Sequence, residues 1–318
     1  MKYSDTKIVT LCGGVGGSKL AYGLNSILDP DNLTIIANTG DDFVHLGFYI
    51  CPDIDTIIYT LADLNDSEKG WGRKEESWRT MEILGQLGAD TWFQLGDKDL
   101  ALHLYRSKAY RAGSSLTSIT KDISEKLGVQ AHVLPMSNEM IQTIVDTDKG
   151  KFLFQEYFVK NKSEPIIRGI SFKSKSASIT SEVRDVMADS NQKGFIICPS
   201  NPYLSIDPSL SIKEFKKSII DFKSPKIAIS PIVNRNSMKG PTSKIMEEIG
   251  IEVSCISIAE HYRGLIDGII IDESDEEQVD KIKEMGIEVK LSKIIVKTKE
   301  EKNRLAKESI EFIQEIAS

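Results

Sequence analysis

The chain has little of what marks several common classes of protein. Its four cysteines lie far apart and form no CxxC pair, so the sequence predicts reduced, buried thiols rather than a metal site or a disulfide framework. No apolar run approaches the roughly 18 residues of a membrane span, and the N-terminus leads into an apolar strand without a signal segment. We therefore expect a cytoplasmic protein that has no membrane partner.

Positive charge is not in excess either. The 318 residues carry a formal net charge of -7, with lysines and acids interleaved along the chain. This balance speaks against nucleic acid as a partner, so any anionic ligand has to be held by local groups. With 40% hydrophobic residues, the chain is long enough to bury a large core, as one large domain or one and a half.

The most informative stretch runs from Thr6 to Leu24, TKIVTLCGGVGGSKLAYGL. An apolar, β-branched run is followed by a glycine cluster and an amphipathic segment, a pattern typical of strand, tight loop and helix. Glycines permit positive φ and close approach, so free N–H groups and a helix N-terminus can face a phosphate. The alternative is a glycine turn that only packs a helix on a sheet. The predicted phosphate-binding residues are Gly13, Gly14, Gly16, Gly17, Ser18 and Lys19.

Two named nucleotide motifs do not fit this loop. A dinucleotide fingerprint needs a third glycine where the chain has Lys19, and an acidic residue where the next predicted strand, 33–37, ends in Asn38. A Walker loop needs the lysine before Ser or Thr, whereas Ser18 precedes Lys19 here. A nicotinamide-dependent oxidoreductase is disfavoured by Lys19 and Asn38.

The densest group of acids follows this second strand. Asp41 and Asp42 would lie at the carboxyl end of the strand, where open α/β sheets bind ligands, and Asp53 and Asp55 follow Pro52, a favourable first helical residue. We expect both pairs to open toward one crevice and to form a Mg²⁺ site, because Mg²⁺ takes one or two carboxylates plus substrate phosphate oxygens. The alternative is that Asp53 and Asp55 only cap a helix.

Further along, the pattern predicts a short strand at 92–95 and a helix after GDKD. Asp97 either caps that helix or holds a ligand. His103 lies in an apolar helical stripe, where a packed histidine is more common than a ligand or a base. Arg106 and Arg111 are candidate phosphate contacts, although an exposed helix face is the default for both.

The order of predicted elements indicates an α/β fold with a Rossmann-like, doubly wound, mainly parallel sheet. We assign residues 1–130 and 190–318 to this nucleotide- and metal-binding core and 131–189 to a smaller inserted α+β subdomain. The aromatic residues of the insert form either a wall for a planar ring or simply core. After the insert, a buried strand ends in the polar turn CPSNP.

Several short motifs occur in a characteristic order: GGVGGSKL, NTGDD, CPDIDT, GWG, LGDKDLALH, RAGSSLT, PMSN, CPSNPYLSI and SPIV…KGPTSK. Each is weak alone, but the ordered set is specific. It resembles the 2-phospho-L-lactate transferase family of coenzyme F420 biosynthesis, and the likeness covers roughly Lys7 to Leu265.

The resemblance implies a Mg²⁺-dependent transfer. The acceptor would be the deazaflavin Fo, whose terminal ribityl hydroxyl attacks the phosphorus attached to lactate in lactyl-2-diphospho-5′-guanosine. GMP leaves, and the product is F420-0. Some family members use an enolpyruvyl donor, which would give dehydro-F420-0, and the sequence leaves the donor open. The family also implies a homodimer.

The same resemblance implies roles for individual residues. Asp55 and Asp53, in PDIDT, would be catalytic, with Asp55 at the hydroxyl end of Fo, and Asp41, Asp42 and Asp53 would hold the metal. Gln94 stands where the family commonly has a Lys or Arg that contacts Fo, so we expect a contact by hydrogen bonding without positive charge. The guanosine end of the donor would contact Gly13, Gly14, Gly16, Gly17, Ser18, Lys19, Asn38, Ser200 and Asn201.

A second class of protein shares part of this pattern. Regulatory proteins of the gluconeogenesis-factor type, which bind nucleotide sugars, resemble the chain through the glycine loop and the SNP turn. CPDIDT followed by GWG, and LGDKDLALH, favour the transferase.

Overall fold

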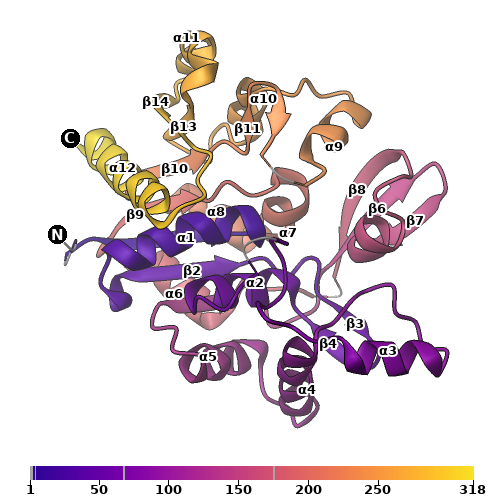
Figure 1. Ribbon diagram of the computed structural model, residues 1–318. Coiled ribbons are helices and arrows are strands. Elements are labelled where there is room, and N and C mark those ends of the chain that lie inside the picture. Colours follow the sequence, from indigo (N-terminus) through magenta and orange to yellow (C-terminus); the bar gives the residue numbers. More distant parts are fainter. Residues whose placement is uncertain (1–2, 4, 67–68, 175, 239) are drawn as a thin grey trace.

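A seven-stranded parallel sheet forms the centre of the protein (Figure 1). The computed structural model describes residues 3, 5–66, 69–174, 176–238 and 240–318. The strand order is β14-β13-β10-β9-β1-β2-β5. The strands are β1 (Lys7–Cys12), β2 (Leu33–Ala37), β5 (His132–Pro135), β9 (Gln192–Ile197), β10 (Lys226–Ile229), β13 (Gly268–Asp272) and β14 (Glu288–Ser292). The predicted Rossmann-like α/β class is confirmed.

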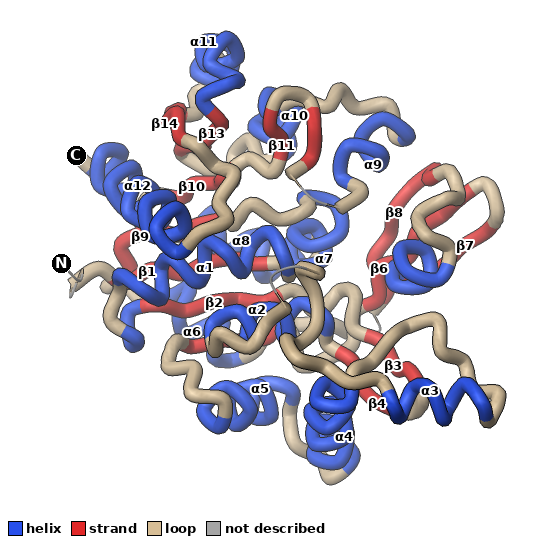
Figure 2. The backbone as a smooth tube through the Cα atoms, in the orientation of Figure 1, coloured by secondary structure: helices blue, strands red, loops and turns tan. Residues whose placement is uncertain are grey.

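Helices cover both faces of the sheet (Figure 2). Ile8 and Cys12 of β1 belong to one apolar core, and the alternating residues Val9 and Leu11 belong to the other, as expected for a parallel strand buried on both sides. The first core includes residues of α1 (Val15–Ile27), α2 (Pro52–Leu61), α5 (Leu116–Lys126) and α12 (Lys299–Ala317). The second includes residues of α6 (Ser181–Ala188), α8 (Lys213–Asp221), α10 (Cys255–His261) and α11 (Val279–Lys283).

The order of the strands reverses between β1 and β9. From β1 the chain proceeds through β2 to the edge strand β5, and it then returns to β9 on the other side of β1. Two neighbouring strands whose connections leave in opposite directions form a topological switch point, and open α/β sheets bind ligands outside the carboxyl ends of such strands. The fold thus places a candidate site after β1 and β9.

The inserted sheet is antiparallel and lies beside the main one (Figure 1). In it, β6 (Gln142–Thr147) pairs with β7 (Gly150–Leu153) and with β8 (Ile167–Lys173). By contrast, β5 pairs with β2 of the main sheet. The three-stranded sheet therefore contains fewer residues than the insert expected at 131–189. The expectation included β5 because β5 and the strands of the insert are similar short apolar runs.

A further lobe contains the hairpin of β3 (Phe43–His45) and β4 (Phe48–Ile50) together with α3 (Arg79–Gln86) and α4 (Asp97–Arg111), which come after α2 in the sequence. The strand predicted at 92–95 is wrong, since the chain is irregular there. Trp92 and Phe93 instead pack around Phe43, with ring centroids 5.9 and 4.9 Å away. The apolar run thus builds an aromatic cluster rather than a strand.

The remaining short elements complete the chain. They are α7 (Asp207–Leu210), α9 (Thr242–Glu248), β11 (Ile232–Val233), β12 (Asn236–Ser237), the 3-10 turns η1 (Pro30–Asn32) and η4 (Glu273–Gln278), and the π-helical turns η2 (Glu156–Lys160) and η3 (Pro202–Ile206). Across the described ranges, no helix combines the length and the apolar character needed to cross a membrane. All four cysteines are buried and unpaired, as predicted.

Candidate active site

The glycine loop and the SNP turn meet at the switch point. The loop follows β1, the turn follows β9, and the Gly13 N–H donates to Ser200 Oγ over 3.0 Å. Helix α1 begins at Val15 with Gly14 at its N-cap, and no side chain caps its first turn. The N–H groups at this end of α1 are therefore left for an acceptor other than a capping side chain.

The loop glycines do not have positive φ, contrary to our expectation. They are required because other groups approach the backbone closely. A Cβ on Gly16 would overlap the carbonyl oxygen of Pro199, and one on Gly14 would overlap a carboxylate oxygen of Asp53. Gly16 thus serves to pack α1 against the turn after β9, whereas Gly14 brings the loop against an acidic side chain.

Asn38 joins two of the predicted acidic residues. Its Nδ2 donates to Asp41 Oδ1 over 2.7 Å and to Asp53 Oδ2 over 2.9 Å. Its Oδ1 accepts the Gly40 N–H over 2.8 Å, and the residue is fully buried. Asn38 and Asp41 thus follow β2, and Asp53 lies in the first turn of α2 against the glycine loop. These three residues are called the acidic cluster below.

Asp55 does not join the acidic cluster, so the expectation of one crevice for both acidic pairs is wrong. Two residues along an α-helix rotate a side chain by about 200°, so Asp53 and Asp55 leave α2 on opposite sides. Asp55 forms an ion pair with Arg106, whose NH1 donates to Oδ2 over 3.0 Å and whose NH2 donates to Oδ1. Arg106 is only 1% exposed and Asp55 4%. The expectation that Arg106 lies on an exposed helix face is therefore also wrong.

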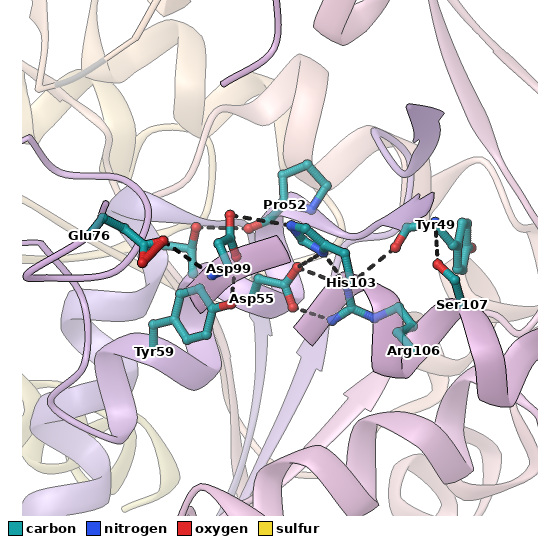
Figure 3. Close-up of polar contacts among 10 residues, drawn as sticks. Tyr49, Pro52, Asp55, Tyr59, Glu76, Asp99, His103, Arg106 and Ser107 are labelled. Atoms are coloured by element: carbon teal, nitrogen blue, oxygen red, sulfur yellow. Dashed lines mark hydrogen bonds and ion pairs between the residues drawn. The ribbon is translucent and has the colours of Figure 1, made fainter. Parts of the chain in front are cut away.

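Arg106 continues into a buried polar network on α4 (Figure 3). Its NH1 donates to His103 Nδ1 over 3.2 Å. Because a guanidinium cannot accept, His103 Nδ1 is the acceptor in this contact, and the other ring nitrogen, Nε2, lies 3.3 Å from Asp99 Oδ2. Asp99 Oδ1 accepts the Tyr59 hydroxyl over 2.6 Å. Burial opposes ionisation of Asp99, but hydrogen bonds from His103 and Tyr59 hold its pKa below the ordinary value. His103 is thus buried, as expected, but it belongs to a polar network rather than to an apolar stripe.

Burial dominates the electrostatics of the acidic residues. It raises the pKa of Asp53 to about 6, although the Asn38 amide and the Gly14 backbone stabilise the charged form. Burial, followed by the charges of Asp53 and Asp42, raises the pKa of Asp41 well above its ordinary value. Burial also raises the pKa of Asp42. Carboxylates in such surroundings favour a proton or a cation.

The acidic cluster fits Mg²⁺ only as a partial ligand set. The described part of the chain contains no group of three or more His, Cys, Asp or Glu residues placed to hold a metal ion. Asp42 accepts the hydroxyl of Tyr49 over 3.3 Å. Asp41 and Asp53 remain as two carboxylates sharing one amide, and one or two carboxylates, completed by waters and substrate oxygens, are what Mg²⁺ commonly takes.

Two predicted phosphate ligands have partners elsewhere. Lys19 Nζ donates to the carbonyl oxygen of Val296 over 3.1 Å. Ser18 Oγ donates to Val15 O over 3.3 Å and accepts the hydroxyl of Thr60 in α2 over 3.3 Å. These contacts tie α1 to α2 and to the segment before α12.

The predicted contacts Gln94 and Asn201 differ in their surroundings. Gln94 is exposed, and its Nε2 donates to the carbonyl oxygen of Thr91 over 2.6 Å. Asn201 Oδ1 accepts the N–H groups of Tyr203 and Leu204 over 3.0 and 3.2 Å. Its buried Nδ2 has no hydrogen-bond partner in the described part of the chain. Asn201 thus retains a donor beside Ser200, whereas Gln94 is held locally.

One functional candidate escaped the sequence analysis, and the role of another, Arg106, differs from the phosphate contact that we expected. Gln155 of the insert donates from Nε2 to Asp41 Oδ2 over 3.2 Å, and nothing in its local pattern indicates this. Arg106 did have a signal, because Asp99, His103 and Arg106 recur at i, i+4 and i+7, the spacing of one helix face.

The chain matches known proteins over nearly its whole length. The family model "2-phospho-L-lactate transferase CofD" matches residues 8–315. A 2-phospho-L-lactate transferase of Methanosarcina mazei is 33% identical over 300 residues, covering 94% of this chain and 98% of that protein. The one of Methanocaldococcus jannaschii is 35% identical over 309 residues, covering 96% and 97%. A phosphoenolpyruvate transferase of Streptomyces coelicolor is 30% identical over 317 residues, covering 98% and 99%.

Among solved structures, a UPF0052-family protein of Bacillus halodurans has a TM-score of 0.62 with 15% identity, covering 96% of this chain and 98% of that one. This likeness concerns the fold alone. The sheet order defines a Rossmann-like α/β protein, and its switch point, with the acidic cluster beside it, is the candidate ligand site. Within that class, the chain belongs to the 2-phospho-L-lactate transferase (CofD) family.

Proposed function

We propose that the protein transfers a 2-phospholactyl or phosphoenolpyruvyl group to the terminal ribityl hydroxyl of the deazaflavin Fo. The donor is lactyl-2-diphospho-5′-guanosine or its enolpyruvyl analogue. The hydroxyl oxygen bonds to phosphorus as the bond to the GMP oxygen breaks, which leaves GMP and F420-0 or dehydro-F420-0. The observation that carries this proposal is the acidic cluster held against the glycine loop at the switch point, in a chain of this family.

The guanosine diphosphate part is proposed to lie over the glycine loop and the SNP turn. Three features support this placement: the uncapped first turn of α1, the Gly13–Ser200 hydrogen bond that joins loop and turn, and the Asn201 Nδ2 that has no partner in the described chain. Helix N-termini and backbone N–H groups are suited to phosphate oxygens.

Asp41 and Asp53 are the residues that would hold Mg²⁺. When bound, the ion would neutralise charge on the transferred phosphate group, which is the main requirement of such a reaction. Asn38 holds the two carboxylates together through one amide nitrogen. Asp42, the third predicted metal ligand, accepts a hydrogen bond from the Tyr49 hydroxyl and is not included in the proposed set of Mg²⁺ ligands.

The two aspartates of PDIDT are proposed to have different roles. Asp53 would accept the proton of the attacking hydroxyl, because it lies at the glycine loop with the acidic cluster. Asp55 would be a positioning residue, because Arg106 engages both of its oxygens away from the cluster. Through this ion pair, Asp55 would fix the first turn of α2 and thereby the position of Asp53.

Mass spectrometry of one defined reaction tests the proposal. Purified protein is incubated with Fo, the lactyl donor and Mg²⁺, with an EDTA control, and the deazaflavin product and GMP are followed. We expect product in the presence of Mg²⁺ and none with EDTA, and a parallel reaction with the enolpyruvyl donor decides the natural donor. Folded protein that binds a guanosine nucleotide but makes no product from either donor would contradict transfer and favour the regulatory, nucleotide-sugar-binding alternative.

Variants of single aspartates test the assignment of roles. Asp53→Asn is expected to lower turnover by about 100- to 10,000-fold, the usual contribution of a general base. Asp31→Asn is the matched control, because the Asp31 side chain is 96% exposed, and its turnover should equal that of the wild type. Wild-type turnover in Asp53→Asn would remove this residue from the mechanism.

A further inference from the structure

One side chain of the inserted sheet reaches the acidic cluster. Gln155 follows β7 and is 6% exposed, and its Nε2 donates to Asp41 Oδ2 over 3.2 Å. The insert approaches the same loop through its backbone, because the Thr143 N–H at the start of β6 donates to the carbonyl oxygen of Gly40 over 2.7 Å. The insert thus contacts the segment that carries Asp41 at two points.

The turn that carries Gln155 is itself anchored. Directly after Gln155, the Glu156 carboxylate accepts the Leu153 N–H over 3.1 Å. The next residue, Tyr157, is fully buried, and its hydroxyl accepts Lys244 Nζ of α9 over 3.3 Å. These contacts fix the turn, and with it the Gln155 donor, relative to β7 and α9.

The two oxygens of Asp41 have separate donors. Asn38 donates to Oδ1 and Gln155 donates to Oδ2, so rotation of the carboxylate would break both hydrogen bonds. Both donors are neutral amides, which orient a carboxylate without cancelling its charge as Lys or Arg would. Each oxygen keeps a further lone pair for a cation.

We propose that Gln155 is a positioning residue that orients the Asp41 carboxylate for a divalent cation, so that the inserted sheet forms part of the metal site. The inference rests on the proposed function, because it assumes that Asp41 is a metal ligand. Hydrogen-bond partners of metal ligands commonly change metal affinity by about 10- to 100-fold when they are removed. The insert therefore supplies a part of the site that the Rossmann-like core lacks.

Mn²⁺ binding, measured by electron paramagnetic resonance on the protein alone, tests this inference. Gln155→Met keeps the length of the side chain and removes the donor, and we expect the dissociation constant for Mn²⁺ to rise about 10- to 100-fold. Gln192→Met is the matched control: Gln192 is also 6% exposed and donates to an aspartate, Asp189, over 3.5 Å, but it lies at the other end of β9. Its Mn²⁺ affinity should equal that of the wild type.

Turnover provides a second readout that a purely structural role would not produce. In Gln155→Met, the Mg²⁺ concentration needed for half-maximal activity should rise by the same factor as the Mn²⁺ dissociation constant, while kcat at saturating Mg²⁺ recovers. Urea unfolding midpoints of both glutamine variants show whether a loss of fold contributes.

The outcomes separate this inference from the proposed function. Wild-type protein that binds no Mn²⁺, or Asp41→Asn that binds it as well as the wild type, contradicts the proposed metal site itself. Binding that is weakened in Asp41→Asn but unchanged in Gln155→Met overturns only the role of Gln155. Equal weakening in Gln155→Met and Gln192→Met would also overturn it, because the effect would then not depend on the contact with Asp41.

Discussion

Removal of the buried guanidinium in Arg106→Met is expected to lower the free energy of unfolding by about 3–5 kcal/mol. Arg106 is 1% exposed and donates to both carboxylate oxygens of Asp55 and to His103 Nδ1. Methionine fills much of the same space, so a cavity is not the main effect. The cost arises because the Asp55 carboxylate stays buried without its cationic partner.

The origin of this cost can be isolated with a second substitution. In the Asp55→Asn background the Arg106 guanidinium is the buried charge that lacks a partner, so Arg106→Met should then cost little or even stabilise the protein. The two substitutions should therefore be coupled by about 3 kcal/mol or more. Asp55→Asn alone is also expected to destabilise the protein, because the Arg106 guanidinium then stays buried without its partner.

Urea unfolding followed by far-ultraviolet circular dichroism at about pH 7 measures these differences. Arg79→Met, at an exposed position of α3, is the control and should change stability by less than about 0.5 kcal/mol. Domains are typically stable by about 5–15 kcal/mol, so the Arg106→Met protein should keep a folded baseline. If it does not fold, the double variant, which lacks the buried charge, should.

The reasoning would be refuted by either of two results. Arg106→Met with a stability within about 1 kcal/mol of the wild type would mean that the Asp55 carboxylate can be solvated in place. A double variant whose loss equals the sum of the two single losses would mean that the side chains do not interact.

Two further predictions concern the glycine loop and the α4 network. Gly14→Ala should lower turnover about 100-fold, because its Cβ would displace the Asp53 carboxylate; Gly169→Ala, with nothing within 4 Å of its Cβ, is the kinetic control and should leave turnover unchanged. The pKa of Asp99 is lower in the folded protein, so its carboxylate stabilises the fold fully above the unfolded pKa of about 3.9, and this contribution is lost as the pH falls through the folded pKa. The stability difference between wild type and Asp99→Asn should therefore shrink as the pH falls from about 5 to about 2; a pH-independent difference would contradict it.

Local patterns were sufficient for most of the main sheet. The strand predicted at 33–37 is β2, and α12 is opened by a capping box between Thr298 and Glu301. Such elements depend on apolar periodicity and on caps within a few residues, so neighbouring residues determine them. The homodimer and the cytoplasmic location do not follow from neighbouring residues, and they stay predictions.

Errors arose where local pattern and packing diverged. The apolar run at 92–95 has the composition of a strand, yet Trp92 and Phe93 pack against Phe43 of the β3–β4 hairpin. Similarly, β5 resembles the strands of the insert but pairs with β2. Both choices depend on which distant surface is available to cover an apolar segment, and composition does not contain that information.

The sequence by itself determined the order of elements, the glycine loop and the acidic residues, because these follow from residue type and short spacing. Only the tertiary structure decided which carboxylates share a site. Asp55 pairs with Arg106 across 51 positions, and Asp41 accepts from Gln155 across 114. A buried charge takes its partner from whatever the packing of distant elements brings within hydrogen-bond reach. Helix α2 directs Asp53 and Asp55 to opposite sides, and that packing supplies Asn38 to the one and Arg106 to the other.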